Sequence, residues 1–152
     1  MKPFKEWNVN SNYGPEVVKV MLEELVTRKN KVEKMEKAKT RWSLFSMFSA
    51  SIFCLFGYQA FQVQQTSLNS NILNALVGQP AVLLLMLLLS IGFIQLHFFG
   101  KKEKKAEKEY DELREEIIVR SPEFWETDVT WESREAVFSY MKKEHDINLY
   151  HR

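Results

Sequence analysis

Few side chains of this sequence are of types that carry out chemistry, and their spacing does not bring them together. The three histidines are His97, His145 and His151. They are not spaced as metal ligands, and the last two lie in a tail that we expect to be frayed. The single cysteine, Cys54, cannot form an internal disulfide and lies in an apolar segment, where it is expected to pack as a small, soft side chain. We therefore predict no metal or cofactor; a redox-active or lipidated Cys54 and a pH-sensitive or ligand-binding His97 are the alternatives.

The carboxylates do not indicate catalysis either. Glu115 and Glu116 are adjacent in a strongly charged segment and are interpreted as a solvated helix face. The sequence contains none of the patterns GxxxxGK[ST], GxGxxG, HExxH, CxxC or GxSxG. We therefore predict no catalytic residues and a protein that is not an enzyme.

The dominant feature is an uncharged stretch. Residues 42–100 contain no Asp, Glu, Lys or Arg over 59 residues, in a chain that is 27% charged. A membrane-spanning helix needs about 20 apolar residues, because hydrocarbon excludes charge. The stretch predicts transmembrane helices at 42–63 and 80–99, joined by a short external connection at 64–79. Trp42 has the position of an interfacial anchor, and Pro80 suits a first helical turn.

Small residues are expected to let the two spans approach each other. The candidates for this helix–helix packing are Ser46, Ala50, Gly57 and Gly92. Small side chains favour close contact in lipid, where van der Waals packing replaces the hydrophobic effect.

A charged segment with a narrow apolar seam flanks each span. Residues 15–41 predict one cytoplasmic helix, and residues 100–120 predict another. Heptad-like spacing marks the seams of a coiled coil. The seam residues are Leu25, Val32, Met35, Ala106, Tyr110, Leu113 and Ile117. Folding the chain about residue 71 places Leu25 opposite Ile117, Ala50 opposite Gly92 and Ser46 opposite Leu96.

The two ends of the chain complete the prediction. Residues 1–14 form an N-terminal segment rich in turn formers, and residues 121–152 form an amphipathic tail. Ser121 and Pro122 are expected to end the preceding helix, because a residue before proline disfavours helical geometry. A last helix is predicted at about 130–144, followed by the frayed tail. Its apolar side, with Trp125, Trp131 and Phe138, either packs on the two arms as a three-helix bundle or presents a face to a partner protein.

Charge predicts the topology. Basic residues flank both spans on their outer sides, and the connection has none. Basic residues stay on the cytoplasmic side, so both termini are predicted to be cytoplasmic. The same residues are suited to anionic lipid headgroups. Residues 28–41 carry a net charge of +5 and residues 109–152 of −6, while the whole chain carries only +1, which argues against nucleic-acid binding.

This order of segments resembles one bacterial group. A Lys/Glu-rich helix at 29–41, a span that begins with Trp, a polar loop, a Leu-rich span, a KKEKK start at 101–105 and an acidic tail with tryptophan are similar to the YpbF-like family of uncharacterised membrane proteins from Gram-positive spore formers. The resemblance implies a bacterial inner-membrane location and no known activity. It assigns no role to any residue.

The predicted protein is therefore an all-α membrane protein: an antiparallel two-span hairpin whose helices extend into a cytoplasmic coiled coil, with a short C-terminal amphipathic helix. The favoured function is a non-enzymatic, membrane-anchored interaction or scaffold module that binds the bilayer and either an unidentified protein or a second copy. The alternatives are a holin-like pore-forming oligomer and a membrane enzyme or its accessory subunit.

Overall fold

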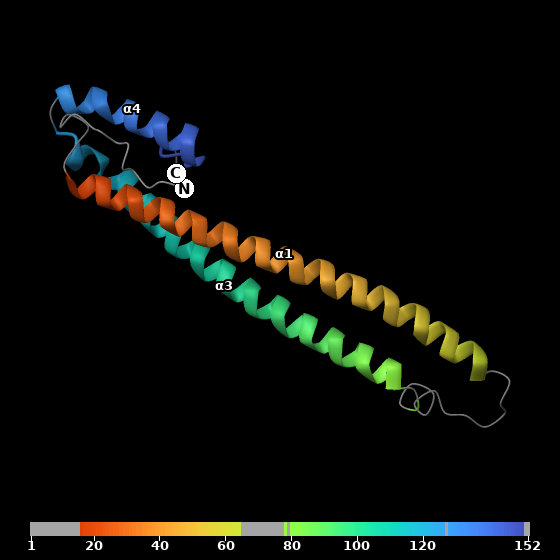
Figure 1. Ribbon diagram of the computed structural model, residues 1–152. Coiled ribbons are helices and arrows are strands. Elements are labelled where there is room, and N and C mark those ends of the chain that lie inside the picture. Colours follow the sequence, from red (N-terminus) through yellow and green to blue (C-terminus); the bar gives the residue numbers. More distant parts are fainter. Residues whose placement is uncertain (1–15, 65–77, 79, 127, 151–152) are drawn as a thin grey trace. The chain divides into compact units, whose positions relative to one another are not determined.

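The computed structural model describes residues 16–64, 78, 80–126 and 128–150, and its regular elements are helices (Figure 1). They are α1 (Glu16–Gln64), α3 (Pro80–Phe124) and α4 (Asp128–His145). The described residues contain no strand, so the predicted all-α class is confirmed. The predicted 1–14 segment, nearly all of the 64–79 connection and His151 lie outside the described residues.

Each long helix joins two segments that the sequence analysis treated separately. α1 covers the predicted charged helix at 15–41 and the predicted span at 42–63 without a break. α3 does the same for the segments 80–99 and 100–120. No proline interrupts α1, and Pro80 is the first residue of α3, where its missing N–H costs no hydrogen bond.

The end of α3 differs from the prediction. The helix continues through Ser121 and Pro122 to Phe124 instead of stopping at residue 120. Pro122 has no N–H to give to the preceding turn. The final turn is nevertheless closed, because the Trp125 N–H donates to the Ser121 carbonyl at 3.2 Å. α4 also begins and ends slightly outside its predicted limits of 130 and 144.

The chain divides into two compact units, and each long helix contributes to both. Unit 1 comprises Met1–Lys34 and Lys104–Arg152, and unit 2 comprises Met35–Glu103. Unit 1 therefore contains the first part of α1, the last part of α3 and all of α4.

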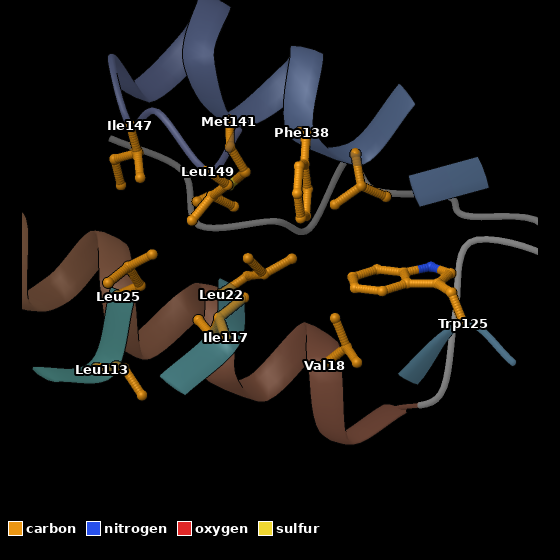
Figure 2. Close-up of a cluster of buried hydrophobic side chains, with 11 residues drawn as sticks. Val18, Leu22, Leu25, Leu113, Ile117, Trp125, Phe138, Met141, Ile147 and Leu149 are labelled. Atoms are coloured by element: carbon orange, nitrogen blue, oxygen red, sulfur yellow. The ribbon is translucent and has the colours of Figure 1, made fainter. Parts of the chain in front are cut away.

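The core of unit 1 is formed by all three helices (Figure 2). Figure 2 shows Phe138 and Met141 of α4 pointing toward Leu22 of α1 and Ile117 of α3. The predicted alternative of a three-helix bundle is thus what the structure contains. The buried cluster consists of Val18, Leu22, Leu25, Leu113, Ile117, Trp125, Val137, Phe138, Met141, Ile147 and Leu149.

This core is wider than the predicted two-helix seam. Leu22 is 0% exposed although the seam omitted it, while the seam residues Val32 and Tyr110 are only partly buried. A third helix covers a second side of α1, so residues beside the seam also become buried. The predicted frayed tail is wrong as well, because Ile147 and Leu149 are 0% and 1% exposed.

Unit 2 has the opposite distribution of side chains. Its buried residues are Ser46, Ser49, Val82 and Gly92, whereas large apolar side chains lie outside. The exposed ones are Leu44, Phe45, Met47, Phe48, Leu55, Phe56, Tyr58, Leu83, Leu84, Met86, Leu87, Ile91, Phe93, Ile94 and Phe98.

One of the described helices, α3, contains a window long and apolar enough to cross a membrane, and 11% of that window is buried. No such apolar window is found in the described residues of α1. Serines at 43, 46, 49 and 51 and the glutamines near its end lower its hydropathy. The predicted pair of spans is therefore not confirmed, although one long apolar helix is present.

The helices pair in antiparallel fashion within each unit, but not in the predicted register. A Cβ atom placed on Gly92 would lie 2.6 Å from the Ser46 Oγ and 3.5 Å from the Phe45 ring, so Gly92 faces Ser46 where the prediction had Ala50. In unit 1, Ile117 lies at the level of Leu22 in Figure 2, where the prediction had Leu25. Both differences amount to about one helical turn.

Candidate interaction surfaces

Of the three aromatic residues predicted as a partner face, two are buried and one is exposed. Trp125 and Phe138 are 1% and 2% exposed, and their rings make an edge-to-face contact with centroids 5.8 Å apart. Phe138 makes a similar contact with Tyr150 at 5.6 Å. Such pairs contribute roughly 0.5–1.5 kcal/mol beyond their buried area. These two residues are buried within the bundle and are therefore not exposed to another protein.

Trp131 is the member of this set that stays at the surface, with 43% of its area exposed. The Arg134 guanidinium lies over its ring, 3.9 Å from the centroid, and donates to the Ser121 Oγ at 3.4 Å. The cation fixes the indole against α4. Trp131 and Arg134 are of the residue types that carry much of the binding energy of protein interfaces.

The C-terminal end of α4 is fastened to α1 by a lysine. Lys29 Nζ donates to the His145 carbonyl at 2.7 Å, to the Asp146 carbonyl, and to the Asp146 carboxylate at 3.3 Å. A helix C-terminus carries partial negative charge and free carbonyls, so a cation from another helix stabilises it. Sequence reasoning assigned Lys29 to membrane topology and missed this role.

Asp146 lets the chain turn back after α4. Its φ of 53° lies in the left-handed region, which aspartate tolerates better than most residues. The Ile147 N–H then donates to the Met141 carbonyl at 3.0 Å, and Arg114 Nε donates to the Asn148 carbonyl at 2.7 Å. These bonds hold residues 147–148 against α4 and α3. The short Ile-x-Leu pattern of residues 147–149 was the only signal of this in the sequence.

A small hollow of about 220 Å³ lies beside this junction, lined by Val26, Lys29, Asn30, Glu33, Lys143, Glu144, His145 and Asp146. Burial lowers the pKa of His145, the charge of Lys29 adds to this effect, and Glu144 opposes it. The described residues contain no group of three or more His, Cys, Asp or Glu side chains that would hold a metal. The hollow is lined mainly by charged residues of the bundle, and its histidine, His145, favours the neutral form.

Ion pairs connect α1 and α3 within each unit. Lys31 bonds Glu109 at 2.8 Å in unit 1, which lowers the pKa of that carboxyl, and Lys39 bonds Glu103 at 2.7 Å in unit 2. Arg120 donates hydrogen bonds to the carboxylates of Glu116 and Glu123, which raises the pKa of Arg120. Exposed pairs of this kind contribute little to stability, because water and salt screen them, so the pairs between α1 and α3 align the helices more than they stabilise them.

The predicted packing residues of unit 2 fall into two groups. Ser46 and Gly92 are buried against each other, and the Ser46 Oγ has no hydrogen-bond partner among the described residues. Ala50 is half-buried, whereas a Cβ on Gly57 would meet no atom within 4 Å. Cys54 and His97 are exposed. Ser49, buried beside Ser46 on α1, was missed although it follows at helical spacing.

Comparison with known proteins identifies the family of this chain. Residues 21–152 match the family described as "Protein of unknown function (DUF2663)". The chain belongs to this family. It is 32% identical over 144 residues to a protein of Bacillus subtilis (strain 168) named "Uncharacterized protein YpbF", with 95% of each chain covered. The predicted YpbF-like resemblance is thereby confirmed. No solved structure matches the chain.

The DUF2663 match includes the structural features described above. It covers all of unit 2 and every residue of the unit 1 core except Val18. Lys29, Trp131 and Arg134 also lie within it. The family description assigns no activity, so function has to be argued from the two units.

Proposed function

We propose that this protein is an integral membrane protein that anchors a small helical bundle, unit 1, as a non-enzymatic interaction or scaffold module. The proposal rests on the distribution of buried and exposed side chains in unit 2, which is opposite to that in unit 1. Large apolar side chains point outward, whereas Ser46, Ser49 and Gly92 are buried. An exposed apolar surface of this extent requires lipid or another protein around it.

The two-span topology with both termini cytoplasmic is part of the proposal. Three observations support it: α1 is helical across the uncharged residues 42–64, Ser46 and Gly92 allow close helix contact, and the basic residues flank only the outer sides of the stretch. The serine content of α1 is compatible with a span, because the Ser51 hydroxyl donates to the Met47 carbonyl and is satisfied within the helix.

Unit 1 is suited to an interaction role because it has its own core and does not depend on a partner for burial. The surface of Trp131 and Arg134 is its candidate docking site, for a protein or a second copy. Nothing in the described residues favours the holin-like alternative: the exposed Ser90 hydroxyl donates to the Met86 carbonyl, and no continuous polar stripe lines either helix.

Membrane integration and topology are tested together by cysteine accessibility. In a Cys54→Ser background, single cysteines are placed by Lys19→Cys, Ser67→Cys and Lys142→Cys. The protein should resist carbonate extraction from membranes. An impermeant maleimide on intact cells should label position 67 only. Carbonate-soluble protein, or labelling of positions 19 and 142, would overturn the proposal.

The docking role is tested separately with a photo-crosslinking amino acid at position 131, in whole cells. The matched control carries it at position 107, which is also exposed in unit 1. A discrete adduct at 131 and none at 107 is expected. Equal adducts at both positions, or none at either, would exclude this surface.

A further inference from the structure

An open groove of about 480 Å³ lies between α1 and α3 in unit 2. Trp42, Phe45, Leu88 and Ile91 form its apolar lining, and Arg41 lies at its rim. Trp42 and Phe45 pack edge to face with centroids 5.6 Å apart, so this wall is fixed. The groove combines a hydrocarbon-like surface with one permanent cation.

The charge of Arg41 is not neutralised within the described part of the chain. No carboxylate there pairs with it, although nearby Lys39 bonds Glu103. Arg41 is the last charged residue before the uncharged stretch. A planar guanidinium binds phosphate oxygens through two parallel hydrogen bonds.

We propose that this groove binds one anionic phospholipid, with its phosphate on Arg41 and an acyl chain along Trp42, Phe45, Leu88 and Ile91. The inference rests on the proposed membrane location. The alternative occupant is a span of a second copy. That occupant fits less well, because residues 42–100 contain no Asp or Glu to pair with Arg41. Bulky side chains line the groove, whereas close helix contacts in lipid use small ones.

The test is native mass spectrometry of the full chain, extracted from membranes in a mild detergent and titrated with phosphatidylglycerol or phosphatidylcholine. The wild type should retain one phosphatidylglycerol in preference to phosphatidylcholine. Arg41→Gln should weaken this binding about fivefold, the usual effect of one basic residue near anionic lipid. Lys101→Gln is the matched control, because Lys101 is a cation at the same boundary that does not line the groove, and it should bind nearly as the wild type does.

A second variant tests the apolar half. Ile91→Trp fills the groove and should reduce the binding of the lipid while Arg41 is intact. Circular dichroism checks that each variant remains helical. Equal affinity for both lipids, equal losses in Arg41→Gln and Lys101→Gln, or a dimer that excludes lipid would overturn the inference. Resistance to carbonate extraction is measured on the same preparations, so failure of the groove is distinguished from failure of the membrane location.

Discussion

Units 1 and 2 are built from the same two long helices and bury opposite kinds of side chain. In unit 1 the inside is leucine, isoleucine, methionine and aromatic residues, and the charged residues are outside. In unit 2 the inside includes serines and a glycine, and leucine and phenylalanine are outside. The difference shows that a helix does not have one inside for its whole length. On the proposed membrane location, what it buries depends on whether water or hydrocarbon surrounds that part.

The strongest way to test this comparison is to remove one large side chain from each unit. Leu22→Ala should lower the free energy of unfolding by about 2–5 kcal/mol, because Leu22 is completely buried. Phe48→Ala, at a site 68% exposed, should change it by less than about 0.5 kcal/mol. Denaturant unfolding of the full chain in detergent measures both. Equal losses would mean that Phe48 is buried by a partner.

Adding a charge tests the outer surfaces. Leu87→Arg should oppose membrane insertion by roughly 2.5–3.5 kcal/mol, the cost of arginine at the centre of a span. Val119→Arg, on the outside of unit 1, should have almost no effect. The two residues are similarly exposed, at 60% and 51%. Carbonate-resistant protein in membranes is the readout. If Leu87→Arg inserts as well as the wild type, the surface of unit 2 does not face hydrocarbon.

The inner contact of unit 2 is tested at its glycines. Gly92→Leu should destabilise the helix pair by about 1–3 kcal/mol, because even a Cβ there would collide with the Ser46 Oγ. Gly57→Leu should be neutral or stabilising by up to about 1 kcal/mol, since nothing lies within 4 Å and leucine favours helix. Thermal melting in detergent compares the two. A melting temperature lowered equally by both changes would argue against a specific contact at Gly92.

Acidification should weaken unit 1 slightly. Burial lowers the pKa of His145 below its ordinary value of 6.5, with Lys29 assisting. The unfolded chain therefore takes up a proton first, and stability is lost as the pH falls through about 6.5 toward the folded pKa. Melting at a series of pH values between 8 and 5 measures this, and His145→Gln should flatten the profile. An unchanged pH dependence in that variant would assign it to another group.

The helical class and several buried residues of unit 1, among them Leu25, Leu113 and Ile117, could be predicted from the sequence, because helical spacing marks the faces that are buried. Trp125 and Phe138 were recognised as an apolar face. That this face is buried within the chain depends on where α4 packs, which local patterns do not encode. The same tertiary contact buries Leu22, Ile147 and Leu149.

The register in which α1 and α3 pair was also predicted incorrectly. Folding the chain about residue 71 assumed that the connection is symmetric. In the structure Gly92 faces Ser46, so the pairing is not centred on residue 71. The end of α3 was missed for a related reason: the Pro122 rule concerns local geometry, but Ser121 and Trp125 are held in the core of the bundle.

The composition of the unit 1 core also determines when it can form during synthesis. Val18, Leu22 and Leu25 leave the ribosome well before Ile147 and Leu149, which complete the same core. α1 must therefore wait for α4 and the residues that follow it, and residues 42–100 emerge in the meantime. A translation arrest or truncation before Asp128 would leave the leucines of α1 uncovered by α4 and available to chaperones or proteases. Synthesis of residues 128–149 is thus the step that closes the bundle.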